Sequence, residues 1–213
     1  MVVSISTSLQ ERYCLFDTAL GSFGIAWNDR GLSRLQLPEA DAAATEKRLR
    51  GAASPGETPP WAEQVIAGIR RYLAGDRVDF ASVGIDLADV GEFRGAVYGA
   101  ARAVGWGQTA SYGEVARRIG FPWGARAVGQ ALARNPVPIV VPCHRILTRD
   151  RRIGGFSAYG GTLTKQRLLA LEGVQVGTPM LPGMVEPQAR VADDLSPRSR
   201  CPDRPPAEAG GPE

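Results

Sequence analysis

The chain has 213 residues, of which 44% are hydrophobic, enough to bury the core of one large domain or two small ones. Its three cysteines are too few and too scattered for a disulfide framework, and its single histidine argues against a structural zinc site. No stretch approaches the roughly 20 apolar residues of a membrane helix, and the N-terminus does not resemble a signal peptide. We therefore expect a cytoplasmic protein without a metal.

The net charge of +3 is unevenly distributed along the chain. Residues 94–167 hold 12 basic and 2 acidic side chains, a net charge of +10, whereas residues 1–93 hold 9 basic and 13 acidic side chains, a net charge of −4. A basic segment between acidic neighbours indicates a polyanionic partner such as nucleic acid. A solvated arginine-rich face is the alternative interpretation.

The N-terminal part is predicted to be a small α/β domain over residues 1–89. Short apolar runs bounded by turn residues indicate strands, and apolar residues that recur at helical spacing indicate a helix. Thr58 is placed to cap that helix. The predicted elements are strands over 12–18, 22–28 and 31–37, a helix over about 41–50, a loop over 54–60, a helix over about 61–73 and a further strand over 78–87.

A second domain, mainly helical, is predicted over residues 90–176. Its first helix carries Phe93 and ends at Gly105, and Ser111 followed three residues later by Glu114 forms a capping box that starts the next. Further helices are predicted to about Arg118, over about 123–134 and over about 163–172, with Gly173 closing the last. The helices on either side of Gly120 have the outline of a helix-turn-helix. Residues 177–213 hold eight of the sixteen prolines and are predicted to be a disordered tail.

The helix over 123–134 has one polar face and many small residues. Arg126, Gln130 and Arg134 are spaced four apart and therefore share a face. Small side chains let a helix approach another backbone closely, which fits either tight helix packing or DNA. The basic face favours DNA.

Cys143 follows a short apolar run bracketed by prolines and precedes the only histidine, His144. A buried cysteine is usually a core residue, but Glu172, in the last turn of a helix, opposes the helix dipole there and indicates a site. A free thiol is mostly protonated at neutral pH, so it needs a base, and a carboxylate can orient that base. Neighbouring residues of a strand point to opposite faces, so either the backbone bends at Cys143 and His144 or a water links them.

The run from Asn135 through Pro142-Cys143-His144-Arg145 resembles the active-site signature of the O6-alkylguanine-DNA alkyltransferases, or methylated-DNA–protein-cysteine methyltransferases. The resemblance is close over about 90–173, loose over the N-terminal part, and absent from the tail. It implies an α+β fold with a ribonuclease-H-like N-terminal domain. Further matches occur at Ser111-Tyr112, at Ala125-Arg126-Ala127-Val128-Gly129, at Gly160-Gly161 and at Leu171-Glu172-Gly173.

The family resemblance implies a function and a role for each reactive residue. An alkyl group moves irreversibly, once per molecule, from O6 of guanine, and also from O4 of thymine, onto Cys143. His144 takes the thiol proton through a water, and Glu172 orients His144. Asn135 braces the segment between the helix-turn-helix and the cysteine. No cofactor is needed, and the protein is expected to act as a monomer on double-stranded DNA.

The resemblance also implies how the damaged nucleotide is bound. Tyr112 helps to turn it out of the duplex and contacts the guanine, while Pro138 lines the pocket. The carbonyl groups of Cys143 and Ile146 accept hydrogen bonds from the guanine amino group. The backbone N–H of Tyr159 faces the guanine O6, with Gly160 beside it.

The resemblance further implies that the helix over 123–134 enters the minor groove, whose width of about 6 Å suits its small side chains. Arg126 fills the gap that the flipped nucleotide leaves, because the O6 atom lies inside the base pair and is reached only by flipping. The remaining groove contacts are expected from Ala125, Ala127, Gly129 and Gln130.

The active-site loop departs from the family pattern. Ala158 occupies the position of a usual tyrosine, with Phe156 and Tyr159 nearby, and the loop over 148–157 is longer and more charged than usual. These departures affect the shape of the pocket.

Two other functions fit parts of the pattern. A cysteine hydrolase would use Cys143, His144 and Glu172 but leave Arg126 without a role. A lesion sensor that binds without reacting would explain the helix-turn-helix, but such relatives lack the acceptor cysteine, which this chain has.

Overall fold

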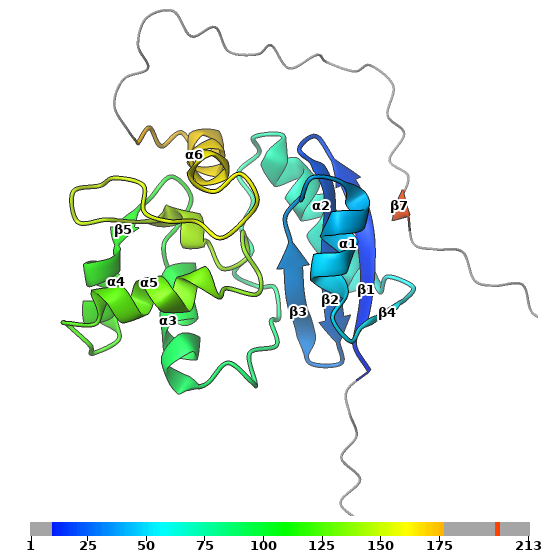
Figure 1. Cartoon of the computed structure of the whole chain (residues 1–213), viewed down its shortest axis with the longest axis horizontal. Helices are drawn as coiled ribbons and strands as arrows, with labels where there is room; N and C mark the ends of the chain where they lie inside the picture. Colours follow the sequence, from blue (N-terminus) through cyan, green and yellow to red (C-terminus); the bar gives the residue numbers. More distant parts are fainter. Residues whose placement is uncertain (1–9, 177–198, 201–213) are drawn as a thin grey trace, which may run out of the picture.

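The computed structural model describes residues 10–176 and 199–200, and it consists of two parts that lie side by side (Figure 1). One part is a sheet with two helices, and the other is mainly helical. The predicted α+β class is confirmed, while the domain boundaries at 89 and 176 stay predictions.

The sheet of the N-terminal part has the strand order β3-β2-β1-β4. The β1–β2 and β2–β3 pairs are antiparallel, which confirms the three predicted strands, but β4 runs parallel to β1 within what we predicted to be a loop. In the predicted tail only β7 is described, and it pairs antiparallel with β1. The strands are β1 (Arg12–Thr18), β2 (Gly21–Asn28), β3 (Gly31–Gln36), β4 (Ser54–Pro55) and β7 (Ser199–Arg200).

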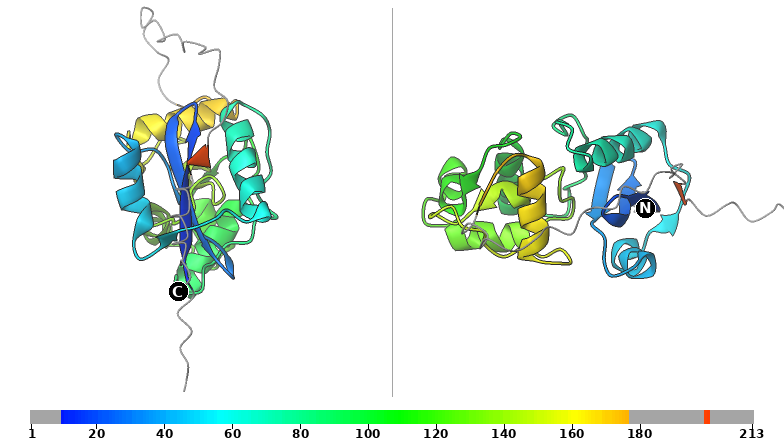
Figure 2. Two further views of the ribbon diagram at one scale, coloured as in Figure 1. Left: turned by 90° about the vertical axis from the view of Figure 1, so that its right-hand side faces the viewer. Right: turned by 90° about the horizontal axis from the view of Figure 1, so that it is seen from above.

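Two helices, α1 (Ala42–Arg50) and α2 (Pro60–Leu73), cover opposite faces of this sheet (Figure 2). The Asp41 side chain caps α1 by accepting a 2.7 Å hydrogen bond from the backbone N–H of Ala44. The prediction that Thr58 caps α2 is wrong. The helix begins after Pro59 without a side-chain cap, and the Thr58 hydroxyl instead donates to the Cys14 sulfur at 3.4 Å.

The prediction of a strand over 78–87 is also wrong, because most of this segment makes no ladder. It touches β3 through a single bridge between Leu32 and Ile85. One side chain satisfies three of its carbonyl groups: the Arg102 guanidinium donates to the carbonyls of Phe80, Ala81 and Val83 at 2.8 to 3.0 Å. An arginine from a later helix therefore replaces the strand partner that the apolar pattern suggested.

The helices predicted in the second part are all present, although α3 ends at Arg102 rather than Gly105. The capping box is confirmed: the Ser111 hydroxyl accepts from the Glu114 N–H at 3.1 Å, and the Glu114 carboxylate accepts from the Ser111 N–H. The elements are α3 (Glu92–Arg102), β5 (Ala110–Ser111), α4 (Tyr112–Arg118), α5 (Ala125–Ala133), the 3₁₀ turn η1 (Cys143–Arg145), β6 (Ile146–Leu147) and α6 (Thr162–Leu171).

The two parts share a continuous core and a direct backbone contact. The Leu35 N–H on the outer edge of β3 donates a 2.8 Å hydrogen bond to the carbonyl of Pro136, which lies in the segment that leads to Cys143. Buried residues of α2 and of the helical part belong to one apolar cluster. The sheet edge therefore helps to position the segment that carries the reactive cysteine.

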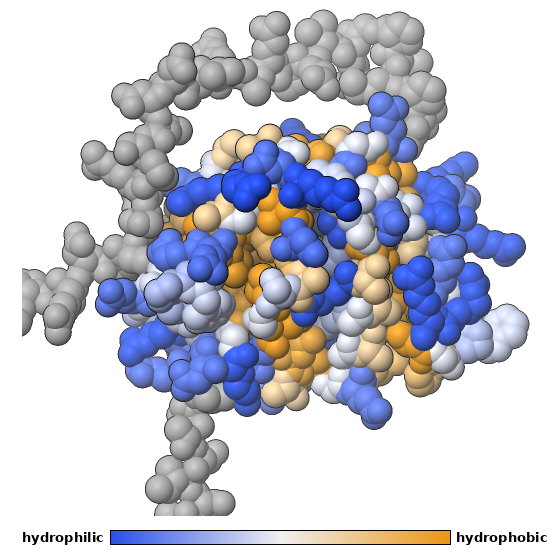
Figure 3. All heavy atoms as spheres, turned by 180° about the vertical axis from the view of Figure 1, so that it is seen from behind, coloured by the Kyte–Doolittle hydropathy of each residue, from blue (hydrophilic) through white to orange (hydrophobic). Residues whose placement is uncertain are grey.

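The face behind the view of Figure 1 carries mostly polar side chains, with apolar groups between them near its centre (Figure 3). Among the described helices, none is long and apolar enough to cross a membrane.

We predict that Arg102→Met destabilises the protein, because it removes the guanidinium hydrogen bonds to the carbonyls of Phe80, Ala81 and Val83. The free energy of unfolding, measured in urea, should fall by about 1–2 kcal/mol, since the carbonyls can partly recover hydrogen bonds from water. Arg71→Met removes an exposed pair with Asp76 and should change it by no more than about 0.5 kcal/mol. Equal effects of the two substitutions would contradict this role of Arg102.

Candidate active site

The segment between α5 and η1 is a tight turn rather than a strand, and Asn135 holds it. Its Nδ2 donates to the carbonyl of Val141 at 2.8 Å, and its Oδ1 accepts from the N–H of Val137 at 3.1 Å. Ile139 has a φ of +72°, a strained conformation for a β-branched residue. The hydrogen bonds of Asn135 and the packing around the turn therefore hold Ile139 in this conformation.

This turn delivers Cys143 and His144 on the single 3₁₀ turn η1. The backbone therefore bends here, because these neighbours do not lie on an extended strand. Cys143 is buried, with 7% of the residue exposed, and Asn135 Nδ2 donates to its sulfur at 3.2 Å. Burial raises the pKa of the Cys143 thiol, against the opposing effect of the Asn135 hydrogen bond. The thiol is therefore protonated at neutral pH and needs a base.

Glu172 is the C-terminal cap residue of α6, and its buried carboxylate accepts hydrogen bonds from several neighbouring residues. Arg145 pairs with it through two nitrogens, each at 2.9 Å. His144 Nε2 lies 2.8 Å from Oε1, the Tyr72 hydroxyl donates to Oε1 at 2.8 Å, and the Gly107 N–H donates to Oε2 at 3.3 Å. Burial acts to raise the pKa of Glu172, but the hydrogen bonds from His144 and Arg145 outweigh it and hold the pKa at about 2. The carboxylate is therefore ionised.

His144 is fully buried beside this carboxylate. An ionised carboxylate only accepts hydrogen bonds, so Nε2 must carry the proton of the neutral imidazole. Nδ1 then holds the lone pair, and it makes no hydrogen bond with any residue that the structure describes. Burial lowers the pKa of His144, although Glu172 opposes this effect. The imidazole is therefore neutral at pH 7, and it can accept a proton at Nδ1.

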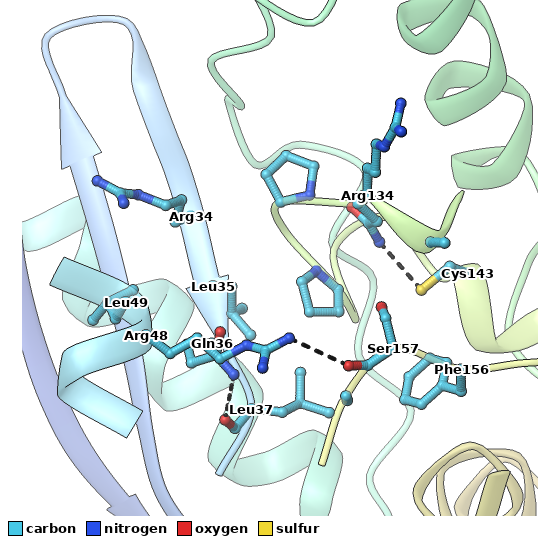
Figure 4. Close-up of a pocket in the computed structure, with 15 residues that line it drawn as sticks. Arg34, Leu35, Gln36, Leu37, Arg48, Leu49, Arg134, Cys143, Phe156 and Ser157 are labelled. Carbon is cyan, nitrogen blue, oxygen red and sulfur yellow. Dashed lines mark hydrogen bonds between the residues drawn. The ribbon is translucent and has the colours of Figure 1, made fainter. Parts of the chain in front are cut away.

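A cavity of about 240 Å³ opens beside Cys143, and both parts of the molecule line it (Figure 4). Pro138, expected to line the substrate pocket, is among the residues that line this cavity. Phe156 and Ala158 of the active-site loop also line it, together with Arg48 of α1. The Arg48 guanidinium donates to the carbonyl of Ser157 at 3.4 Å, which ties the loop to the N-terminal part.

Other residues expected at the guanine lie elsewhere or already have partners. The side chain of Tyr159 is 57% exposed, and neither Tyr159 nor Gly160 lines the cavity beside Cys143. The Ile146 carbonyl accepts from Lys165 Nζ at 2.6 Å, and the Cys143 carbonyl accepts from the Ile146 N–H. Each of these oxygens keeps a second lone pair.

A second cavity, of about 770 Å³, lies between the N-terminal ends of α4 and α5 and the active-site loop. Tyr112, Ala125 and Arg126, predicted to contact the nucleotide and DNA, line it together with further arginines. Gly129 packs on the Tyr112 ring, while Ala127 and Gln130 are exposed on α5. The arginines around this cavity are Arg117, Arg126, Arg149 and Arg151.

The sequence did not indicate the roles of Tyr72, Lys165 and Phe156. Tyr72 belongs to the apolar face of α2 and resembles an ordinary core residue. Lys165 is 1% exposed, its Nζ lies 5.7 Å from the centre of the Tyr112 ring, and burial lowers its pKa to about 8. An aromatic residue two positions away from Ala158 was the only available signal for Phe156. Among the described residues, no group of three or more His, Cys, Asp or Glu side chains could hold a metal ion.

Comparison with known proteins identifies the family. Residues 92–174 match the family model for the DNA-binding domain of 6-O-methylguanine DNA methyltransferase. The methylated-DNA–protein-cysteine methyltransferase of Mycolicibacterium paratuberculosis is 36% identical over 160 residues, which cover 75% of this chain and 91% of that protein.

Solved structures agree with this assignment. The crystal structure of Mycobacterium tuberculosis O6-methylguanine methyltransferase superposes with a TM-score of 0.63 and 31% identity, covering 76% of this chain and 93% of that one. The crystal structure of Mycobacterium tuberculosis OGT in complex with DNA gives a TM-score of 0.61 and 29% identity over the same shares of the two chains. The chain therefore belongs to the methylated-DNA–protein-cysteine methyltransferase family.

Proposed function

We propose that this protein repairs DNA by moving the alkyl group from O6 of a damaged guanine onto Cys143, irreversibly and once per molecule. The observation that carries the proposal is the buried series Cys143, His144 and Glu172, in which the imidazole is neutral and its Nδ1 lone pair is not engaged by a described residue. The same chemistry at O4 of thymine is part of the proposal.

The reaction begins with proton transfer from the Cys143 thiol to His144 Nδ1, relayed by a water. The resulting thiolate attacks the alkyl carbon, a new C–S bond forms, and the bond from that carbon to O6 breaks. The bond's electron pair leaves with the guanine, which takes up one proton, so the proton lost by the thiol is balanced. The thioether has no low-energy route back to a thiol, and the protein is consumed.

The damaged base must leave the duplex to reach Cys143, at a cost of a few kcal/mol. We propose that α5 lies in the minor groove with Arg126 in the gap left by the base. Tyr112, between this helix and the reactive centre, contacts the flipped guanine, and Pro138 lies against the alkyl group. The arginines around the second cavity provide positive charge for the phosphates. The protein is proposed to act in the cytoplasm as a monomer, without a cofactor.

Intact mass measured after mixing with a duplex that contains O6-methylguanine tests the function directly. One methyl group per molecule, mapped to Cys143, is expected. Cys143→Ala should retain lesion binding and gain no mass, whereas the control Cys14→Ala should react as the unmodified protein does. Transfer in the Cys143→Ala variant would refute the assignment. Lesion binding without any mass gain in the unmodified protein would favour a sensor, and turnover of a small ester would favour a hydrolase.

Arg126→Ala should slow transfer from duplex DNA far more than transfer from free O6-benzylguanine, because only the duplex requires a group to replace the flipped base. A loss of about 100-fold on duplex, against less than about twofold on the free base, fits a wedge that offsets a few kcal/mol of unstacking. Arg118→Ala, an exposed arginine of α4 outside the second cavity, is the matched control. Equal losses on both substrates would indicate a structural arginine.

The pH dependence should reveal the base. His144 acts when neutral, and burial lowers its pKa, so protonation should slow the single-turnover reaction with O6-benzylguanine only below pH ~6.5, the ordinary histidine pKa. Above pH ~6.5 the rate should not change with pH, up to the pH at which the Cys143 thiol begins to ionise. That pH is high, because burial raises the pKa of this thiol. His144→Gln should lose most of the rate together with the acid limb. An acid midpoint clearly above 6.5 would argue against a buried neutral base.

A further inference from the structure

Tyr72 is a buried polar group that the mechanism above does not use. Its side chain is fully buried, and its hydroxyl lies 2.8 Å from Glu172 Oε1 and 3.2 Å from His144 Nε2. It comes from α2, in the part of the chain opposite the helix-turn-helix, and is 100 residues away from Glu172 in the sequence. The hydroxyl therefore connects the N-terminal part directly to the carboxylate that orients the base.

The packing of the Tyr72 ring fixes the position of the hydroxyl. The ring makes edge contacts with Trp106, at 5.4 Å between centroids and 83° between planes, and with Phe80, at 6.1 Å and 64°. Val65 and Ile69 precede Tyr72 by seven and three residues and share the buried face of α2. The ring is therefore held on several sides, and only the hydroxyl is directed at Glu172.

The direction of this hydrogen bond follows from the charges. Glu172 is ionised and can only accept, so the phenol must donate. Burial, followed by the charge of Glu172, raises the pKa of Tyr72, which keeps the phenol protonated. Oε1 thus receives three donors, from Tyr72, His144 and Arg145, and the carboxylate cannot rotate without breaking all three bonds.

We propose that Tyr72 is a positioning residue for alkyl transfer: its hydroxyl fixes Glu172 Oε1 and, through it, the imidazole of His144 that deprotonates Cys143. This inference rests on the proposed function. It assigns the N-terminal part a direct share in the reactive centre, in addition to its packing against the helical part.

The proposal predicts a change that packing alone does not. Without the Tyr72 donor, the negative charge of Oε1 is less dispersed and attracts an imidazolium more strongly, so the pKa of His144 should rise. The other charged groups that act on His144 are Glu172 and Arg145, and Lys165 of α6 at longer range, and all remain in place. Protonation of the base should therefore begin at a higher pH.

The test is Tyr72→Phe, which keeps the ring and removes only the hydroxyl. Single-turnover reaction with O6-benzylguanine, which needs no DNA, is followed from pH 5 to 9 by intact mass. We expect the rate at pH 7 to fall at least about tenfold, the value of one hydrogen bond to a charged group, and the acid midpoint to move to higher pH. The midpoint does not depend on the amount of folded protein, so partial unfolding of the variant does not obscure it.

Tyr98→Phe is the matched control. Tyr98 is equally buried, and its hydroxyl donates at 3.0 Å to the carbonyls of Ala131 and Arg134, away from Glu172. This variant should keep the acid midpoint of the unmodified protein. An unmoved midpoint and rate in Tyr72→Phe, or the same shift in both variants, would overturn the proposal. Failure of the unmodified protein to take the methyl group of an O6-methylguanine duplex on Cys143 would instead refute the proposed function.

Discussion

The buried charge of Glu172 is the constraint on which the reactive centre depends. A carboxylate taken out of water is costly unless donors replace the water it has lost. Those donors come from α2, from the turn after α3 and from η1, and they converge on the carboxylate at the end of α6. These segments must meet before the charge is satisfied. Folding of the protein and assembly of the site are therefore the same event.

The ionised carboxylate determines the state of each group along the series. It fixes the proton of His144 on Nε2 and leaves Nδ1 as the acceptor, while burial keeps the imidazole neutral. The same burial keeps Cys143 protonated. A protonated, enclosed thiol reacts poorly with oxidants and stray electrophiles, since the thiolate is the nucleophile. A protein that acts once benefits from a cysteine that is protected from such side reactions.

Local features of the fold could be predicted from the sequence, whereas features that depend on distant partners could not. The capping box at Ser111 and the first three strands follow from neighbouring residues alone. The segment 78–87 has the apolar pattern of a strand, yet three of its carbonyls accept hydrogen bonds from Arg102, a residue of the following helix, and not from a neighbouring strand. Tyr72 has the spacing of a core residue, and nothing near it in the chain reveals the carboxylate it meets. The reactive residues could be predicted from the sequence only because Cys143 and His144 are adjacent and their segment resembles a known signature.

The cavity beside Cys143 is also formed by both parts of the molecule, so both parts shape the space for the substrate. One wall is formed by Pro138 and the loop residues Phe156 and Ala158, and the other by Arg48 and its neighbours on the N-terminal part. In the proposed reaction, an alkyl group that reaches the sulfur lies between these walls, and the Arg48 guanidinium, which donates to the Ser157 carbonyl, connects them. The space available to an adduct is thus set jointly by α1 and the active-site loop. In the proposed mechanism, the N-terminal part therefore contributes twice: the Tyr72 hydroxyl positions the base, and the residues around Arg48 form one wall of the cavity for the alkyl group.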